Sequence, residues 1–211
     1  MISTFQNALV LSPHPDDAEF SCGGTLNKMN SEGVKVHLVT FSPCIKSLPD
    51  GLDPDILYQE QTRSIEHLGI DKKNVVNFNF PVREFPRYRQ EILEELIILR
   101  KKISPDLVVL PNSNDIHQDH KTIFEEGLRA FKNCCLIGYE LPWNNIKHEI
   151  NLRVDLDECD LDAKLKSIGE YKSQSHRPYM DKDFFRGLAS VRGVMIGAKY
   201  AEGFQIINWK I

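Results

Sequence analysis

The sequence lacks the cysteine patterns that mark disulfide-rich and cysteine-zinc proteins. Its five cysteines show no CxxC pair and no regular spacing; they are Cys22, Cys44, Cys134, Cys135 and Cys159. An odd count without a repeat excludes a disulfide framework, and the missing CxxC pair excludes a cysteine zinc site. We therefore expect reduced thiols and a cytoplasmic location.

Long apolar runs and an excess of basic charge are also missing. No apolar stretch approaches the ~20 residues of a membrane span, so no transmembrane segment is expected. Residues 1–6 show neither the basic region nor the apolar region of a signal peptide. The chain carries 26 basic and 30 acidic residues, a formal net charge of −4. Because nucleic-acid binders present a basic stripe, no nucleic-acid partner is predicted.

What is present suits one globular domain. The chain has 211 residues, 41% of them hydrophobic, which is enough for one substantial core. We predict a single domain over residues 1–211. The sequence does not determine an oligomeric state, and a homo-oligomer is left open.

Apolar runs alternate with amphipathic segments along the chain. Strands are predicted at residues 8–11, 34–41, 74–80, 106–110, 136–141 and 204–208. Helices are predicted at 18–31, 55–68, 87–103, 118–131 and 161–171. This alternation predicts an α/β, three-layer, Rossmann-like fold with a mostly parallel sheet between helices. In such folds, ligands bind beyond the carboxyl ends of the strands.

Two polar clusters follow predicted strands. Residues 13–19 come after the first strand, and residues 114–120 come after the strand at 106–110. Together they hold three histidines and four aspartates. A catalytic zinc takes three protein ligands and keeps one position open for water, so a His, Asp and His set suits it. A remaining carboxylate could then move protons. A prolyl turn with helix-capping aspartates is the structural alternative.

At these residues the sequence resembles the LmbE-like, or PIG-L, family of zinc-dependent N-acetylglucosaminyl de-N-acetylases. The resemblance rests on the run His14-Pro15-Asp16-Asp17 after a strand and on the later pair His117 and His120. Smaller similarities extend along the chain; they are Gly23-Gly24-Thr25, Leu68-Gly69, Ser173-Gln174 and Tyr200-Ala201-Glu202-Gly203-Phe204.

The resemblance implies a role for each residue that matches a motif. His14, Asp17 and His120 would bind Zn²⁺, although Fe²⁺ suits the same ligands. Asp16 would be the general base and later the acid that protonates the leaving amine. His117 would stabilise the oxyanion. The implied reaction is removal of an N-acetyl group from an amino sugar or small glycoconjugate.

Other roles are our own inference from sequence position. Asp119 could orient a ligand histidine, or its negative charge could interact favourably with the positive N-terminal end of the helix dipole. The candidate substrate contacts after strands or in a glycine stretch are Arg83, Glu140, Trp143 and Arg192. Many family members carry an arginine three residues before the position of Glu60, where this chain has Leu57. The identity of the sugar is therefore left open.

Two other functions remain alternatives at this point. A metal-dependent phosphoesterase could use the same layout, although such enzymes often hold two metals. A non-catalytic sugar-binding protein could keep the pocket, although a binder has no need for the base Asp16.

Overall fold

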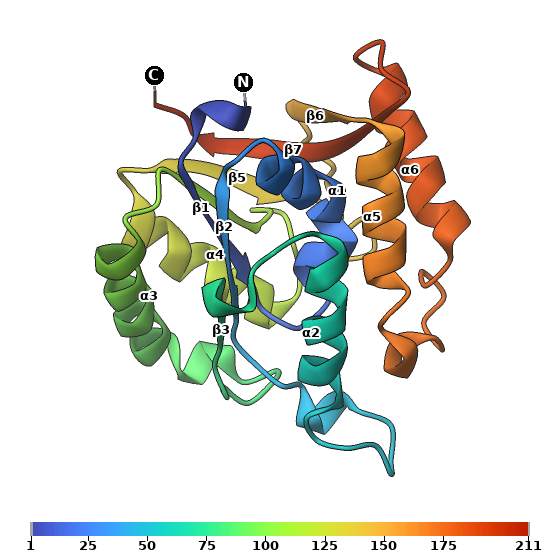
Figure 1. The fold of residues 1–211 in the computed structure, drawn as a ribbon. Helices are drawn as coiled ribbons and strands as arrows, with labels where there is room; N and C mark the ends of the chain where they lie inside the picture. The colour runs from blue at the N-terminus through green and yellow to red at the C-terminus, as the bar shows by residue number, and fades with distance from the viewer. Residues whose placement is uncertain (1, 211) are drawn as a thin grey trace.

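The computed structural model describes residues 2–210, which form one seven-stranded sheet between layers of helices (Figure 1). The strand order is β3-β2-β1-β4-β5-β7-β6. The strands are β1 (Asn7–Ser12), β2 (Lys35–Thr40), β3 (Val75–Asn77), β4 (Leu107–Pro111), β5 (Cys135–Tyr139), β6 (Leu152–Leu156) and β7 (Tyr200–Asn208). The α/β fold with a mostly parallel sheet, predicted from the alternation of elements, is confirmed.

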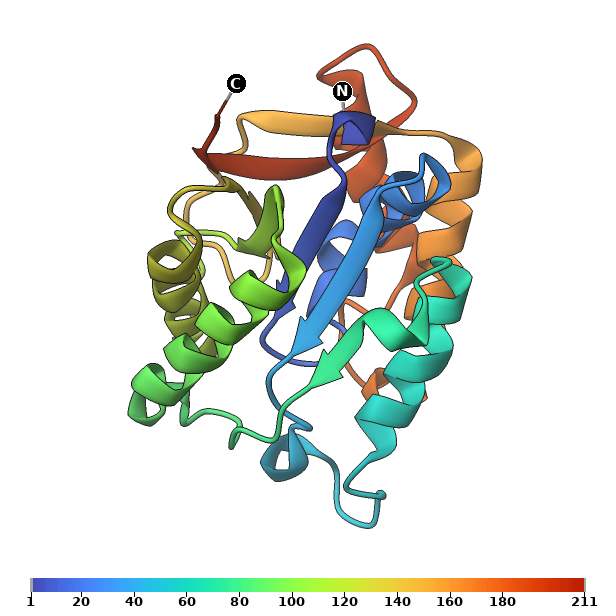
Figure 2. The ribbon, with the colours of Figure 1, turned by 60° about the vertical axis from the view of Figure 1, so that its left-hand side comes forward.

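The five strands β3, β2, β1, β4 and β5 are parallel to one another. β7 is antiparallel to both of its neighbours, β5 and β6 (Figure 2). β1 lies at the centre and pairs with β2 and β4. The carboxyl ends of these three strands therefore meet at one edge of the sheet.

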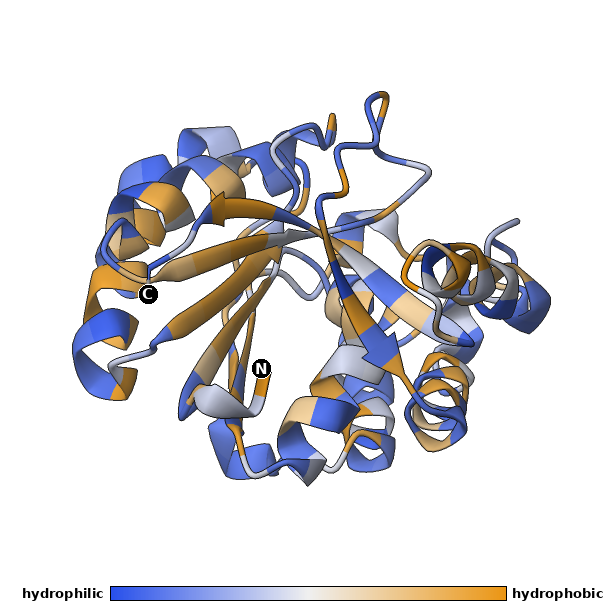
Figure 3. Ribbon diagram, turned by 90° about the horizontal axis from the view of Figure 1, so that it is seen from above, coloured by the Kyte–Doolittle hydropathy of each residue, from blue (hydrophilic) through white to orange (hydrophobic). Residues whose placement is uncertain are grey.

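Helices cover both faces of the sheet, as the view from above shows (Figure 3). They are α1 (Asp17–Ser31), α2 (Ile56–His67), α3 (Arg89–Ile103), α4 (Gln118–Phe131), α5 (Glu158–Ile168) and α6 (Lys182–Val194). α1, α2, α5 and α6 pack together on one face, and α3 packs with α4 on the other. Within residues 2–210, no helix combines the length and the apolar character needed to span a membrane.

Successive residues of each strand pack into different hydrophobic cores, one on each face of the sheet, because side chains alternate between the faces. On β1, Ala8 and Val10 face the core beneath α1 and α5, whereas Leu9 and Leu11 face the core beneath α3 and α4. All four are fully buried. Burial on both faces explains why the central strands are continuous apolar runs and not alternating ones.

Two elements were not predicted from the sequence, β6 and α6. β6 is an edge strand in which the polar Arg153 and the exposed Asp155 interrupt the apolar residues, so it shows no apolar run. α6 buries only one narrow face, at Phe185, Ala189 and Gly193. β7 also begins at Tyr200, before the predicted residue 204, because the polar Glu202 inside the strand hides its start.

Glu202 is buried under a kink in α1. The backbone leaves the helical conformation at Cys22, where φ is −136°. The amides of Gly24 and Thr25 beyond the kink donate to the Glu202 carboxylate at 3.1 and 2.7 Å. Lys164 of α5 forms an ion pair with the same carboxylate. Two short sequence similarities, at residues 23–25 and 200–204, thus meet at one buried contact.

The Glu202→Gln variant is expected to be destabilised by about 3–5 kcal/mol, because it leaves the Lys164 ammonium buried without its counter-charge. Urea unfolding followed by circular dichroism measures the effect. The matched control is Glu158→Gln, which removes an exposed partner of Lys199 and should leave the free energy of unfolding nearly unchanged. Equal stability of the two variants would show that the buried pair contributes nothing.

Candidate active site

The two polar clusters lie side by side at the carboxyl ends of β1 and β4. The loop after β1 carries residues 13–16 into α1, and the loop after β4 carries residues 112–117 into α4. Because β1 and β4 are neighbouring parallel strands, their following loops must lie together. The adjacency of two stretches about a hundred residues apart is therefore a consequence of strand order.

Three nitrogen and oxygen atoms form a nearly equilateral triangle. His14 Nδ1 lies 3.1 Å from Asp17 Oδ2 and 3.2 Å from His120 Nε2, and the last two atoms are 3.2 Å apart. Ligands at ~2.0–2.1 Å from a tetrahedral zinc are separated by ~3.3–3.4 Å. The triangle therefore has the size and the donor types that a zinc ion requires.

Each histidine of the triangle is held from behind by a buried carboxylate. His14 Nε2 lies 3.0 Å from Asp119 Oδ2, and His120 Nδ1 lies 2.7 Å from Asp115 Oδ2. Asp119 also accepts from the backbone amides of Arg83 and Phe85, at 2.6 and 3.2 Å. Carboxylates placed this way orient metal-binding histidines and raise their basicity.

The electrostatics of the triangle favour a positive charge within it. Burial lowers the pKa of His120, but the Asp17 and Asp115 carboxylates outweigh it and raise that pKa to about 10. Burial raises the pKa of Asp17, but His120 and His14 outweigh it and bring the value well below the usual range. The site thus stabilises a positive charge between these groups. A bound metal ion would supply that charge in place of a proton.

Asp16 stands beside the triangle without belonging to it. Its backbone adopts a φ of 96°, a conformation that is strained for any residue except glycine. This strain is typical of functional positions. Burial raises the pKa of the Asp16 carboxyl well above its ordinary value, the charges of Asp17 and Glu19 add to the effect, and Arg177 opposes it.

His117 faces the same space with a defined ring orientation. Its Nδ1 accepts a hydrogen bond from the backbone amide of Asp119 at 3.2 Å, so the neutral ring carries its proton on Nε2. Burial, together with His120 and His14, lowers its pKa to about 4, which keeps the imidazole neutral at neutral pH. His14, His117 and His120 also form a group that could hold a metal ion.

A cavity of about 220 Å³ opens over these groups. One of its walls is aromatic: Trp143 stacks on Tyr179 with ring centroids 4.0 Å apart and an interplanar angle of 3°. Arg177, Gln174 and Leu57 also line the cavity.

Comparison with known protein families identifies the family to which this chain belongs. The family profile described as "PIG-L: GlcNAc-PI de-N-acetylase" matches residues 9–131, which include both polar clusters. This chain belongs to the PIG-L family. The match confirms the resemblance seen in the sequence, and the protein is an N-deacetylase of this family.

Individual relatives extend the likeness over nearly the whole chain. A diacetylchitobiose deacetylase of Thermococcus kodakarensis is 26% identical over 226 residues, covering 96% of this chain and 83% of the relative. The structure of the N,N'-diacetylchitobiose deacetylase of Pyrococcus horikoshii superposes with a TM-score of 0.80 at 26% identity, covering 96% of this chain and 84% of that one.

The fold by itself does not determine the reaction. GalB of Pseudomonas putida, a 4-carboxy-2-hydroxymuconate hydratase, superposes with a TM-score of 0.76 at 18% identity and covers 98% of each chain. The assignment of this PIG-L protein therefore rests on the family match, and the roles of its residues rest on the site.

The residues proposed as substrate contacts lie in different surroundings. Trp143 lines the cavity of the PIG-L site. The Arg83 guanidinium donates to the carbonyl of Lys46 at 2.8 Å and is not among the lining residues described. Arg192 and Glu140 form an ion pair with each other, also apart from that lining. Their roles as substrate contacts remain predictions.

Sequence reasoning missed several groups of the site. Asp115 belongs to the polar cluster at residues 114–120, where helix capping was the structural alternative, and the structure adds its contact with His120. Arg177 and Tyr179 lie in a stretch without periodicity, so only their position in the fold reveals them. Glu19 points elsewhere: its carboxylate is fully buried and accepts from the Tyr171 hydroxyl at 2.7 Å.

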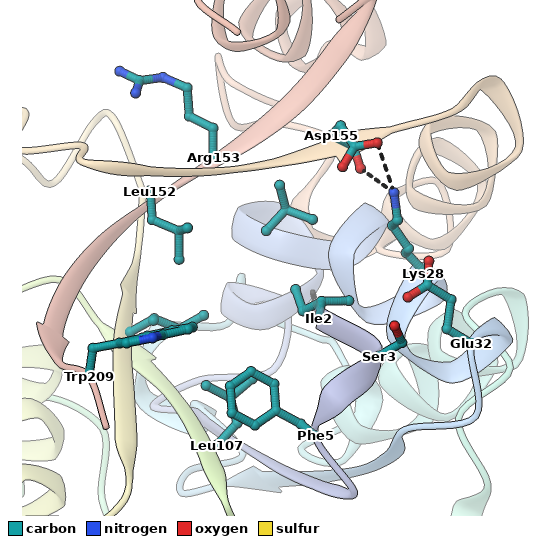
Figure 4. A pocket seen from close by; sticks show the side chains of 12 residues that line it. Ile2, Ser3, Phe5, Lys28, Glu32, Leu107, Leu152, Arg153, Asp155 and Trp209 are labelled. Atoms are coloured by element: carbon teal, nitrogen blue, oxygen red, sulfur yellow. Dashed lines mark hydrogen bonds and ion pairs between the residues drawn. The ribbon is translucent and has the colours of Figure 1, made fainter. Parts of the chain in front are cut away.

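A second cavity, of about 360 Å³, lies at the opposite edge of the sheet, where β1 and β4 begin (Figure 4). Its walls are mainly apolar and include the edge-to-face pair of Phe5 and Trp209. Lys28 at its rim pairs with Asp155 at 3.1 Å. Among the described residues, its lining contains no histidine, whereas His14, His117 and His120 line the smaller cavity.

Proposed function

We propose that this protein is a zinc-dependent hydrolase that removes the N-acetyl group from an amino sugar or a small glycoconjugate. The observation that carries the proposal is the triangle of His14 Nδ1, Asp17 Oδ2 and His120 Nε2, with the unbonded Asp16 carboxyl beside it.

The proposed mechanism divides the work among a few side chains. His14, Asp17 and His120 would hold the zinc ion, which would polarise the amide carbonyl and lower the pKa of water toward ~7. Asp16 takes a proton from the attacking water. The Nε2–H of His117 donates to the carbonyl oxygen as negative charge develops there. Asp16 then gives the proton to the nitrogen as the C–N bond breaks, which releases the free amine and acetic acid, and the acid ionises to acetate.

The substrate class follows from the cavity and the relatives together. The two relatives with 26% identity are named for deacetylation of diacetylchitobiose, a neutral N-acetyl sugar. The stacked rings of Trp143 and Tyr179 give the cavity an apolar wall on which the face of a sugar ring can pack. An N-acetylated sugar fits this wall, with its acetamido group directed at the triangle.

One experiment tests the proposal: metal content by mass spectrometry and acetate release from a panel of N-acetyl sugars. We expect about one zinc per chain, since one triangle forms one complete site, and acetate release that stops after chelation and returns with zinc. A protein that binds no metal, or one that binds zinc and releases no acetate from any N-acetyl compound, would contradict the proposed function. Better activity with iron under anaerobic conditions would change the metal but keep the reaction.

The supporting carboxylates provide a further prediction. Asp119→Asn and Asp115→Asn should each weaken zinc binding about 10- to 100-fold, because each removes the charge that orients a ligand histidine. Competition with a fluorescent chelator measures the affinity. Asp53→Asn, a change in an exposed loop residue, is the control. Unchanged affinity in both variants would mean that the two aspartates serve only as helix caps.

A further inference from the structure

Arg177 differs from every other arginine in the described chain. The others donate to a carboxylate or to a backbone carbonyl; they are Arg63, Arg83, Arg87, Arg89, Arg100, Arg129, Arg153, Arg186 and Arg192. Arg177 makes one contact, from Nε to the side-chain amide oxygen of Gln174 at 3.4 Å. Its terminal guanidinium nitrogens have no protein acceptor among the described residues.

This guanidinium lies in the cavity of the active site. Arg177 is the one arginine or lysine among the described lining residues. It is half-buried, and its terminal nitrogens are not among the buried unpaired atoms of the described residues, so they are open to a ligand that enters the cavity. Asp16 lines the same cavity, yet the two side chains form no ion pair within residues 2–210. The arginine is therefore not simply the counter-charge of the general base.

The loop that carries Arg177 is held firmly in place. Glu60, a buried residue of α2, accepts from the amide of Ser173 at 2.9 Å and from its hydroxyl at 2.6 Å. The Arg177 amide in turn donates to the carbonyl of Gln174 at 2.9 Å. Anchoring the backbone of this loop reduces the entropy that is lost when Arg177 binds an anion.

We propose that Arg177 is a specificity-determining residue that binds an anionic group on the substrate, a phosphate ester or a carboxylate carried by the N-acetylated sugar. The proposal rests on the proposed function and narrows its substrate class from N-acetylated sugars in general to those that carry an acidic group. The planar guanidinium suits both anions, since it can donate two parallel hydrogen bonds to either. The sugar ring would lie between this anion site and the triangle, against the Trp143 and Tyr179 wall.

The kinetic test compares neutral and acidic substrates that differ in one group. We expect a higher kcat/KM for N-acetylglucosamine 6-phosphate, N-acetylglucosamine 1-phosphate or N-acetylglucosaminuronic acid than for N-acetylglucosamine. Arg177→Gln should lower the value for the acidic substrate about 10- to 100-fold more than the value for the neutral one, and the extra loss should appear mainly in KM. The phosphate and carboxylate substrates distinguish the two sources of the anion.

The controls separate this role from others. Arg63→Gln removes a guanidinium outside the cavity and should change neither value. Arg177→Lys keeps the charge but loses the two-pronged geometry, and should recover only part of the activity on acidic sugars. An equal loss on neutral and acidic substrates, or no preference for acidic ones in the wild type, would overturn the proposal while leaving the deacetylase assignment intact.

A binding measurement tests the same inference without turnover. Zinc-loaded Asp16→Asn protein is titrated with N-acetylglucosamine and with its 6-phosphate, in the presence and absence of the Arg177→Gln change. Tighter binding of the phosphate that disappears with Arg177 supports the anion site. Tighter binding that survives the change would place the phosphate on the metal, which contradicts the proposal. Zinc binding without any acetate release in the kinetic test would instead count against the proposed function.

Discussion

Asp16→Asn is expected to lower kcat about 10³- to 10⁴-fold while zinc stays bound, because the amide cannot accept the proton of the attacking water or return it to the amine. The side chain contributes no atom to the metal triangle and makes no hydrogen bond to the protein among those found in residues 2–210. The change is also nearly isosteric, so the strained backbone at this position is kept. Acetate release and zinc content are measured on the same sample.

The result separates chemistry from structure. A loss of zinc together with activity would show that Asp16 is a ligand and that the assignment of the base is wrong. Near-normal turnover would remove the general base from the mechanism altogether. Titration with N-acetylglucosamine checks that the cavity is intact: the variant should bind this sugar with the same affinity as the wild type.

Asp17→Asn makes the same chemical change at the next residue. Unlike Asp16→Asn, which should keep its zinc, this variant is expected to bind zinc weakly. Asp17 Oδ2 lies between His14 Nδ1 and His120 Nε2, at 3.1 and 3.2 Å. Removing its charge takes away the anionic ligand, so zinc affinity should fall by more than about 100-fold, beyond the loss of a supporting carboxylate. Activity should fall with the occupancy of zinc.

Thermal unfolding with and without added zinc measures this second effect independently of activity. Zinc at about a hundred times its dissociation constant should stabilise the wild type by ~2.7 kcal/mol, since it binds only the folded chain. The Asp17→Asn variant should show little stabilisation at the same concentration, whereas Asp16→Asn should respond like the wild type. A zinc response of Asp17→Asn equal to that of the wild type would exclude Asp17 as a ligand and favour the set of three histidines.

The candidate site shows why short motifs were readable in the sequence. His14, Asp16 and Asp17 are neighbours in one loop, so their chemistry is visible as a single run of letters. His117 and His120 are separated by one helical turn, which makes them a recognisable pair at the start of α4. The roles of these residues remain predictions, but their convergence followed from the strand order that the alternation of elements predicted.

The supporting groups could not be read in the same way. Asp115 reaches His120 across a loop, and Asp119 reaches His14 from another chain segment, so each pairing depends on three-dimensional approach. Glu202 lies 177 residues beyond Thr25, whose amide it accepts. Edge elements such as β6 bury little apolar surface, and a weak burial pattern gives a weak signal in the sequence.

The sequence by itself determined the fold class and the family, and it supplied the candidate metal ligands. Each of these depends on local patterns: apolar periodicity along an element and reactive side chains within a few positions of one another. Only the tertiary structure decided which atoms form the triangle, which carboxylates hold its histidines, and that Arg177 lies in the cavity without an anionic partner. These relations join segments far apart in the chain. Their distances depend on how the sheet and helices pack, and no spacing along the chain encodes that packing directly.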